Sequence, residues 1–285
     1  MADRQRPSMP LLRNLHMTLQ QKHEALKSLL REMESLLVAY SGGVDSALLL
    51  AVAHSVLGDK TLAVTGNSAS LAQRERAAAA DLAKLLGVEH CFIDTEEVAS
   101  PDYAANPVNR CYYCKSELYS KLREVADQRG LKHIVNGTNV DDLGDHRPGL
   151  VSAREANVRS PLCEAEFTKQ DVRDLARQLG LPIWDKPAMP CLSSRIPYEQ
   201  PVTPEKLAMI EQAEDVLIAL GFKQMRVRHL GDTARIELPA EDLPRFYKEN
   251  LFEPVLKRFL EIGFKRVTVD PEGFRSGRLN EESFA

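Results

Sequence analysis

The segment Ser41-Gly42-Gly43-Val44-Asp45-Ser46 has the residue types and spacing of a phosphate-binding loop. Gly42 and Gly43 allow backbone conformations closed to other residues and let phosphate oxygens approach main-chain N–H groups. Ser41 and Ser46 add hydroxyl donors, and a helix starting here would offer unpaired N–H groups and a favourable dipole to an anion. A plain strand–turn–helix junction built from small residues is the alternative interpretation.

Asp45 is the unexpected member of this loop. A carboxylate beside phosphates repels them unless a cation lies between, so we assign Asp45 to Mg²⁺ coordination. The loop therefore predicts Mg²⁺ with ATP as the ligand. The Walker pattern and the dinucleotide fingerprint are both absent from the chain.

Three cysteines form a second candidate site. Cys111 and Cys114 have metal-ligand spacing, and Cys191 lies in a proline-rich segment. A structural zinc site would need a fourth Cys or His, whereas an iron–sulfur cluster held by three cysteines leaves one iron free to bind a further sulfide. A redox pair and an incidental pair remain open. Cys91 and Cys163 are expected to be packing thiols.

The elements that must position these residues alternate between strand and helix patterns. Short apolar runs predict buried strands, and segments with helical spacing of apolar residues separate them. The expected strands are Leu36–Tyr40, Thr61–Thr65, His90–Ile93 and His133–Asn136; the expected helices include Met17–Met33, Ala47–Leu57 and Lys169–Leu179. This order indicates an α/β fold with a doubly wound parallel sheet, whose ligand crevice lies at the carboxyl ends of the strands.

A smaller α+β domain is expected at the C-terminal end. Six prolines between Leu181 and Pro204 exclude a regular helix or central strand, so this stretch is interpreted as a shaped linker. Thr168 and Thr203 are expected N-caps, and Gly180 is an expected helix C-terminus. The later elements are a helix from Pro204 to Leu220, strands Met225–His229, Ala234–Leu238 and Arg266–Val269, and a second helix. The predicted domains are 1–185 and 186–285.

The composition predicts a soluble, cytoplasmic protein. The chain has 285 residues, 44% of them hydrophobic and 27% charged, with a formal net charge of −4. No apolar run approaches the roughly 20 residues of a membrane helix, and residues 1–17 lack the apolar core of a signal peptide. Neither a membrane nor a nucleic-acid partner is expected, since the net charge does not favour a phosphate backbone.

The loop at Ser41–Ser46 resembles that of the ATP-pyrophosphatase (PP-loop) superfamily, with its adenine-nucleotide α-hydrolase-like fold. That resemblance implies cleavage of ATP between the α and β phosphates. Gly137 and Thr138, with Asn139, look like the second nucleotide-contacting segment of the superfamily, and Asp141 or Asp142 would be available to the metal. A turn that simply needs a glycine is the alternative for this segment.

A closer resemblance, to the LarE family, covers the chain from about Leu36 to Val269. The segments that carry it are Gly137–Asp142, Asp145–Gly149, Val158–Leu162, Trp184–Pro187, Cys191–Arg195, Arg226–Arg228 and Ala234–Glu237. It implies sulfur insertion during synthesis of the nickel-pincer nucleotide cofactor. A carboxylate of a pyridinium dicarboxylate mononucleotide is adenylylated with release of pyrophosphate, and sulfur then replaces AMP.

The same resemblance gives the cysteines a role. Cys191 matches the cysteine that some members sacrifice as the sulfur donor, so Cys191 and Asp45 are the expected catalytic residues. Cys111 and Cys114 match the extra pair of another branch, in which three cysteines hold a four-iron cluster carrying a transferable sulfide. We favour the cluster route, with a [4Fe–4S] cluster on Cys111, Cys114 and Cys191.

Basic residues near the thiols and in the second domain are candidate substrate contacts. Lys115 and Arg195 adjoin the cysteines in sequence, and either would stabilise developing charge. Arg226 and Arg228, two apart on a strand, share a face and would clamp the substrate phosphate, unless they are solvated charges on an edge strand. The resemblance also implies a homo-oligomer with an anion and metal site at a subunit interface, for which Glu214 and Glu237 are candidate Mg²⁺ ligands.

Two other enzyme classes share the loop chemistry. An ammonia-dependent amide synthetase of the NAD or GMP synthetase type would adenylylate its substrate in the same way but needs no cysteine. A tRNA-thiolating enzyme would combine the loop with cysteine pairs, but the net charge and the absence of flanking CxxC pairs of a zinc ribbon argue against it.

Overall fold

The computed structural model of the chain describes residues 17–144 and 148–275. Residues 1–16, on which the expectation about a signal peptide rests, lie outside this range, as do residues 145–147 of the motif that ends at Gly149. Among the described residues, no helix combines the length and the hydropathy that crossing a bilayer requires.

A four-stranded parallel sheet organises the first part of the chain. Its strands are β1 (Leu36–Ala39), β2 (Thr61–Asn67), β3 (Glu89–Asp94) and β4 (His133–Val135), in the spatial order β3-β2-β1-β4. Leu36 aligns with Thr61 on one side and with His133 on the other. The parallel, doubly wound arrangement predicted from the sequence is confirmed.

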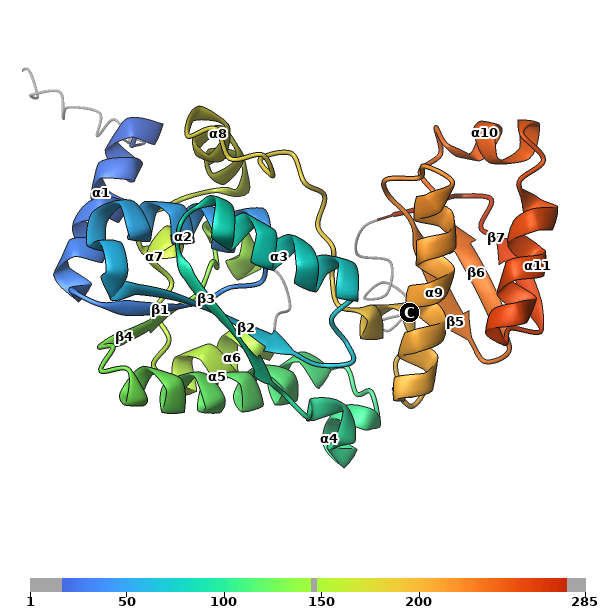
Figure 1. Cartoon of the computed structure of the whole chain (residues 1–285), viewed down its shortest axis with the longest axis horizontal. Helices are drawn as coiled ribbons and strands as arrows, with labels where there is room; N and C mark the ends of the chain where they lie inside the picture. The colour runs from blue at the N-terminus through green and yellow to red at the C-terminus, as the bar shows by residue number, and fades with distance from the viewer. Residues whose placement is uncertain (1–16, 145–147, 276–285) are drawn as a thin grey trace, which may run out of the picture.

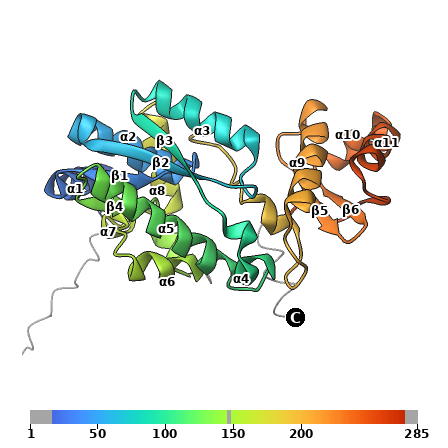
Figure 2. The ribbon, with the colours of Figure 1, turned by 60° about the horizontal axis from the view of Figure 1, so that its bottom comes forward.

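Helices cover both faces of this sheet, as Figures 1 and 2 show. One face carries α1 (Leu19–Met33), α2 (Val44–Leu57), α3 (Gln73–Leu85) and α8 (Lys169–Gln178); the other carries α5 (Arg110–Gln128) and α6 (Pro148–Glu155). Alternate residues of β1 explain the two cores: Leu36 and Val38 join the cluster with α1 and α2, whereas Leu37 joins the cluster with α5.

Short helices and turns complete this part of the fold. They are η1 (Gly58–Lys60), η2 (Glu97–Ala99), α4 (Pro101–Ala104), η3 (Val140–Gly144), α7 (Pro161–Glu164) and η4 (Leu192–Arg195). Within the proline-rich segment, the 3₁₀ turn η4 is a short regular element. The rest of the segment before α9 forms neither helix nor strand. Prolines lack the N–H group that a helix or central strand needs, so this outcome follows from the sequence.

A second, three-stranded sheet lies beyond the proline-rich segment (right side of Figure 1). It contains β5 (Arg226–Leu230), β6 (Thr233–Glu237) and β7 (Arg266–Val269); β5 and β6 are antiparallel, and β6 and β7 are parallel. Helices α9 (Pro204–Ala219), α10 (Leu243–Lys248) and α11 (Phe252–Ile262) accompany it. Phe222, Phe246 and Phe259 are buried in its core. The smaller α+β unit was predicted, and the domain division at residues 185 and 186 stays a prediction.

Local signals explain most helix boundaries. Thr168 and Asp171 form a capping box at the start of α8, Thr203 accepts a hydrogen bond from Lys206 N, and Gly180 has a φ of 73°. Two expectations were wrong in detail. Helix α2 begins three residues before Ala47, and the single helix expected before the last strand is two helices, α10 and α11.

Candidate functional site

The phosphate loop leaves the end of β1 and enters α2 directly. Gly42 has a φ of 71°, and a Cβ there would lie 2.9 Å from the Ala79 Cβ, so both conformation and space require glycine. Ser46 Oγ donates to Gly43 O over 3.1 Å and accepts from Ser41 N over 3.2 Å. The loop is thus closed by its own hydroxyl group, and the N-terminal N–H groups of α2 follow it.

The segment at Gly137 packs against this loop. A Cβ at Gly137 would lie 2.7 Å from Ser46 N and 3.0 Å from the Asp45 carbonyl carbon. Thr138 N donates to Asn136 Oδ1, and Asn139 Nδ2 donates to Asp45 Oδ1 over 3.1 Å. The structure therefore brings the segment with Gly137 and Thr138 to the phosphate loop. Asn139 of this segment contacts Asp45 although the two residues are 94 positions apart in the sequence.

Asp45 forms an ion pair with a lysine side chain. Lys169 Nζ lies 2.5 Å from Asp45 Oδ2, and the Lys169 N–H donates to Asp141 Oδ2 over 2.8 Å. Within residues 17–144 and 148–275, no three Asp, Glu, His or Cys side chains are grouped closely enough to hold a metal ion. Protein-bound Mg²⁺ usually uses one or two carboxylates together with substrate phosphates, so a lone loop carboxylate fits that chemistry.

The three candidate cysteines line one cavity with the phosphate loop. The cavity has a volume of about 370 Å³, and its lining includes Ser41, Cys111, Cys114 and Cys191. Cys111 and Cys191 are exposed. Burial, opposed by the charge of Lys115 and reinforced by those of Glu97, Cys191 and Cys111, raises the pKa of the Cys114 thiol to about 12. All three thiols therefore share one cavity with Ser41 of the phosphate loop.

Neighbouring side chains fix the turn that presents Cys191. Tyr103 Oη and Ser193 Oγ are 2.7 Å apart, and Arg110 donates to Ser193 O over 3.2 Å. Arg195 Nη1 donates to Cys191 O over 3.1 Å and to Pro190 O over 2.5 Å. Tyr103, Arg110 and Arg195 are nearly fully buried. The sequence predicted a shaped linker here but gave no sign of Tyr103 or Arg110.

The ligand chemistry of the thiols matches an iron–sulfur group. Cysteine thiolates are the usual ligands of such clusters, and the three predicted ligands share one cavity. No three metal-binding side chains among the described residues come close enough to hold a single ion. The remaining two thiols are elsewhere: Cys91 is in β3 and Cys163 in α7, and burial raises the pKa of both.

The predicted substrate-binding arginines are buried, and two of them, Arg195 and Arg228, pair with buried glutamates. Arg195 Nε donates to Glu214 Oε1 over 2.8 Å, and Arg228 Nε donates to Glu237 Oε1 over 3.0 Å. Both glutamates are 0% exposed. Arg226 lies 4.6 Å from the Phe274 ring centroid.

The alternative interpretation of Arg226 and Arg228, as solvated charges on an edge strand, is wrong. Their strand, β5, does lie at the edge of its sheet, but both arginines are buried. Burial, together with the charges of Arg195 and Arg228, lowers the pKa of Arg226 to about 10. This crowding of cations suits an anion. Glu214 and Glu237 lie in this cluster and Asp45 lies in the phosphate loop, so the candidate Mg²⁺ ligands occupy two separate places.

Several polar residues at the site were missed from the sequence. Lys169 contacts Asp45, and Lys186 Nζ lies 2.7 Å from Glu75 Oε2 and 3.4 Å from Gly42 O. Glu97 is buried in the thiol cavity, where Ser68 and Ser70 donate to its Oε1. Each contact joins segments that are distant in sequence, so local patterns do not reveal it. Only Lys169 offered a local signal, because it directly follows the N-cap residue Thr168.

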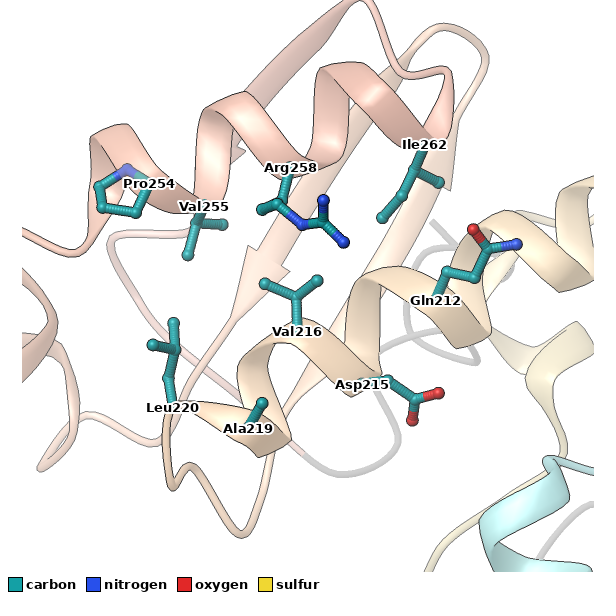
Figure 3. A pocket seen from close by; sticks show the side chains of 9 residues that line it. All are labelled: Gln212, Asp215, Val216, Ala219, Leu220, Pro254, Val255, Arg258 and Ile262. Carbon is teal, nitrogen blue, oxygen red and sulfur yellow. The ribbon is translucent and has the colours of Figure 1, made fainter.

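A second hollow lies between α9 and α11 (Figure 3). Its lining is mainly apolar, with Val216, Leu220, Val255 and Ile262 facing the groove and Arg258 above it. None of the predicted site residues lines this hollow. The thiol cavity is therefore the candidate active site.

Known proteins resemble the chain over most of its length, although no protein-family model matches it. It is 45% identical to an uncharacterised protein from Synechocystis, over 92% of this chain and 98% of that one. It is 39% identical to the pyridinium-3,5-bisthiocarboxylic acid mononucleotide synthase of Lactiplantibacillus plantarum, over 93% of this chain and 95% of that enzyme. One subunit of the glutamine-hydrolysing GMP synthase of Archaeoglobus fulgidus is 28% identical over 64% of this chain and 63% of its own length.

Proposed function

This chain belongs to the LarE family of ATP-dependent sulfurtransferases, and we propose that it inserts sulfur into a carboxylate of a pyridinium dicarboxylate mononucleotide during nickel-pincer cofactor synthesis. The observation that carries the proposal is that the phosphate loop and three thiols line one cavity. A nucleotide bound at Ser41 would bring its activated acyl group toward Cys191.

The reaction has two bond exchanges. A substrate carboxylate oxygen attacks the α-phosphorus of ATP, the bond from that phosphorus to the bridging oxygen of the β-phosphate breaks, and pyrophosphate leaves. A sulfur nucleophile at the thiol end of the cavity then attacks the acyl carbon of the adenylate. The bond from that carbon to the AMP oxygen breaks, AMP leaves, and a thiocarboxylate remains.

The residues of the chain divide these tasks. The N–H groups that start α2 and the turn at Gly42 bind the phosphates. Asp45 would hold Mg²⁺, which when bound neutralises phosphate charge. Gly137 permits the close packing that fixes the loop. Arg195 donates to the carbonyl of Cys191 and Arg110 to that of Ser193, so the backbone at the sulfur end of the cavity is preorganised.

Cys111, Cys114 and Cys191 would hold a [4Fe–4S] cluster, which when bound supplies an open iron for a transferable sulfide. The shared cavity supports this assignment. Arg226 and Arg228 form the proposed site for the substrate phosphate, where burial and then the charges of Arg195 and Arg228 lower the pKa of Arg226.

The decisive experiment measures iron, acid-labile sulfide and thiocarboxylate product on protein purified without oxygen. We expect the wild type to hold a cluster that Cys111→Ala lacks, and Cys191→Ala to release pyrophosphate without forming thiocarboxylate. Cys163→Ala is the matched control, because that thiol lies outside the cavity, and it should retain both cluster and product. Full thiocarboxylate formation by Cys191→Ala would contradict the proposal.

The similarity to GMP synthase favours one alternative, an ammonia-dependent amide synthetase. Such an enzyme uses the same adenylylation but no thiol. Amide formation from ammonia that is unchanged in Cys191→Ala, together with no thiocarboxylate from the wild type, would establish this alternative.

A further inference from the structure

Glu97 is a buried acidic side chain in the thiol cavity to which the proposed sulfur transfer gives no role. It is 2% exposed and lines the cavity together with the three candidate thiols. Its Oε1 accepts from Ser68 Oγ over 2.6 Å and from Ser70 Oγ over 2.9 Å. Its Oε2 is buried and has no hydrogen-bond partner among the described residues. One oxygen of this carboxylate is therefore satisfied and the other is not.

These contacts fit an ionised carboxylate. Such a group only accepts hydrogen bonds, and both serine hydroxyl groups donate to Oε1. A proton on Oε2 would find no acceptor within residues 17–144 and 148–275. Glu75, the other acidic residue of the cavity lining, pairs with Lys186 at 2.7 Å, whereas the partners of Glu97 are neutral hydroxyl groups. A buried charge with no opposite charge beside it is costly, so a cationic ligand would stabilise Glu97.

The surroundings of Glu97 tie it to the sulfur end of the cavity. Ser70, which donates to Glu97, accepts at its carbonyl oxygen from the Leu192 N–H over 2.9 Å, and Leu192 directly follows Cys191. Val98, the residue after Glu97, packs in the same apolar cluster as Cys114. In the proposed reaction the acyl carbon is bonded directly to the pyridinium ring. Attack by sulfur therefore requires that ring at this end of the cavity.

The ring of the proposed substrate carries the charge that would complement Glu97. A pyridinium ring with a ribose on its nitrogen has a permanent positive charge and no N–H group to donate. It needs an anion nearby more than an acceptor in direct contact, and opposite charges attract over longer distances where water is excluded. A ribose hydroxyl group, in contrast, needs an accessible oxygen, and Oε2 of Glu97 is buried.

We propose that Glu97 is the counter-charge for the pyridinium ring and thereby selects a cationic ring at the sulfur end of the cavity. The assignment rests on the proposed function, which supplies the pyridinium substrate. Ser68 and Ser70 keep the carboxylate in place, and the entering ring neutralises its charge. A neutral dihydropyridine ring of similar shape leaves that charge unpaired and binds less tightly.

The test compares two probes that differ in ring charge. They are nicotinic acid mononucleotide, which has a pyridinium ring, and its dihydropyridine form, which has a neutral ring. Calorimetry measures their binding to the full chain with Mg²⁺ and saturating α,β-methylene ATP, which cannot be cleaved between the α and β phosphates. We expect the wild type to prefer the pyridinium form by roughly tenfold or more. Glu97→Gln should lose most of this preference and bind the neutral form as the wild type does.

Glu96→Gln is the matched control. Glu96 precedes Glu97 in the chain and this variant loses the same charge, but Glu96 is exposed and does not line the cavity. It should keep the wild-type preference. Equal affinities of the wild type for the two forms, no binding of the pyridinium form, or an unchanged preference in Glu97→Gln would overturn the proposal. An equal loss of both forms in Glu97→Gln would also overturn it, because Glu97 would then bind the ribose or shape the cavity.

Failure of this proposal is distinct from failure of sulfur transfer. Thiocarboxylate formation by a wild type that shows no preference for ring charge would support sulfur transfer and reject the role of Glu97. A preference that Glu97→Gln loses, in a protein that forms no thiocarboxylate, would support the cation site and reject sulfur transfer.

Discussion

The phosphate loop packs closely against Gly137, which has no side chain to keep the loop away. Its Cα faces the backbone of Ser46, and a Cβ would lie 2.7 Å from Ser46 N and 2.9 Å from Ser46 Cα. Backbone atoms at the start of a helix cannot rotate away as a side chain can. The close approach of two segments therefore depends on glycine at this position.

Gly137→Ala should displace the loop and weaken ATP binding by at least roughly tenfold, with a loss of stability of about 1–3 kcal/mol from overpacking. Calorimetry with ATP and urea-induced unfolding would measure the two effects. Gly144→Ala is the control, since nothing lies within 4 Å of a Cβ there. Tight ATP binding by Gly137→Ala would show that the loop does not depend on this contact.

Two acidic neighbours on α9 differ in what their loss should cost. Glu214 is 0% exposed and accepts from Arg195, Arg74 and the Val227 N–H, whereas Asp215 also pairs with Arg74 but its side chain is 55% exposed. Removing one partner of a buried ion pair leaves an uncompensated charge, which is far more costly than losing an exposed pair.

We expect Glu214→Gln to lower the free energy of unfolding by about 3–5 kcal/mol and Asp215→Asn by less than about 1 kcal/mol. Urea-induced unfolding of both variants would test this. Similar losses in the two would mean that burial does not govern the contribution of Glu214.

At the scale of elements, β5 carries a histidine in the core of the second sheet. His229 is 4% exposed, packs 5.3 Å from the Phe264 ring and has an Nδ1 atom without a hydrogen-bond partner among the described residues. Burial lowers the pKa of His229 below its ordinary value of 6.5, and the charge of Lys206 lowers it further. The folded protein therefore keeps this ring neutral under conditions in which the unfolded chain protonates it.

This shift predicts acid sensitivity. Above pH 6.5 the ring is neutral in both states; as the pH falls through 6.5 the unfolded state binds the extra proton and stability decreases, by at most about 1.4 kcal/mol per pH unit for one group. His229→Phe should show a smaller decline of melting temperature between about pH 7.5 and 5.5. The other histidines are unchanged in this variant, so the difference in slope isolates His229. Equal slopes would rule out this contribution.

The sequence predicted elements better than contacts, for a physical reason. Strand positions, the caps at Thr168 and Thr203 and the proline-rich segment follow from local patterns, and the structure confirms them. Contacts across the fold have no such pattern. Lys169 reaches Asp45 across 124 residues, and Arg74 reaches Glu214 across 140. The thiols could be grouped from the sequence by their chemistry, but the buried residues that hold the Cys191 turn could not.

At the scale of the whole molecule, the proline-rich segment joins the two sheets through a buried cluster. Leu192 and Ile196 of that segment pack with Tyr103 of the first part and with Leu207 and Ile210 of α9. The turn that presents Cys191 lies beside this cluster. The position of the sulfur end of the cavity relative to the phosphate loop thus depends on packing contributed by the second sheet unit.

This shared cluster predicts that the two parts unfold together. Trp184 is the single tryptophan of the chain and lies just after α8, so its fluorescence reports on the first part, whereas far-ultraviolet circular dichroism reports on all helices. In the wild type the two transitions in urea should coincide. Leu207→Ala combined with Ile210→Ala removes apolar contacts at the junction, with an expected cost of about 2–5 kcal/mol for each residue.

In that double variant we expect the two transitions to separate, because the first sheet keeps its own core while the second loses its packing against the proline-rich segment. Leu30→Ala is the control: Leu30 lies in the core beside α2, so its loss should lower the stability but leave the transitions coincident. Coincident transitions in the double variant would show that the ion pairs between α3 and α9, such as Arg74 with Glu214, suffice to couple the two parts.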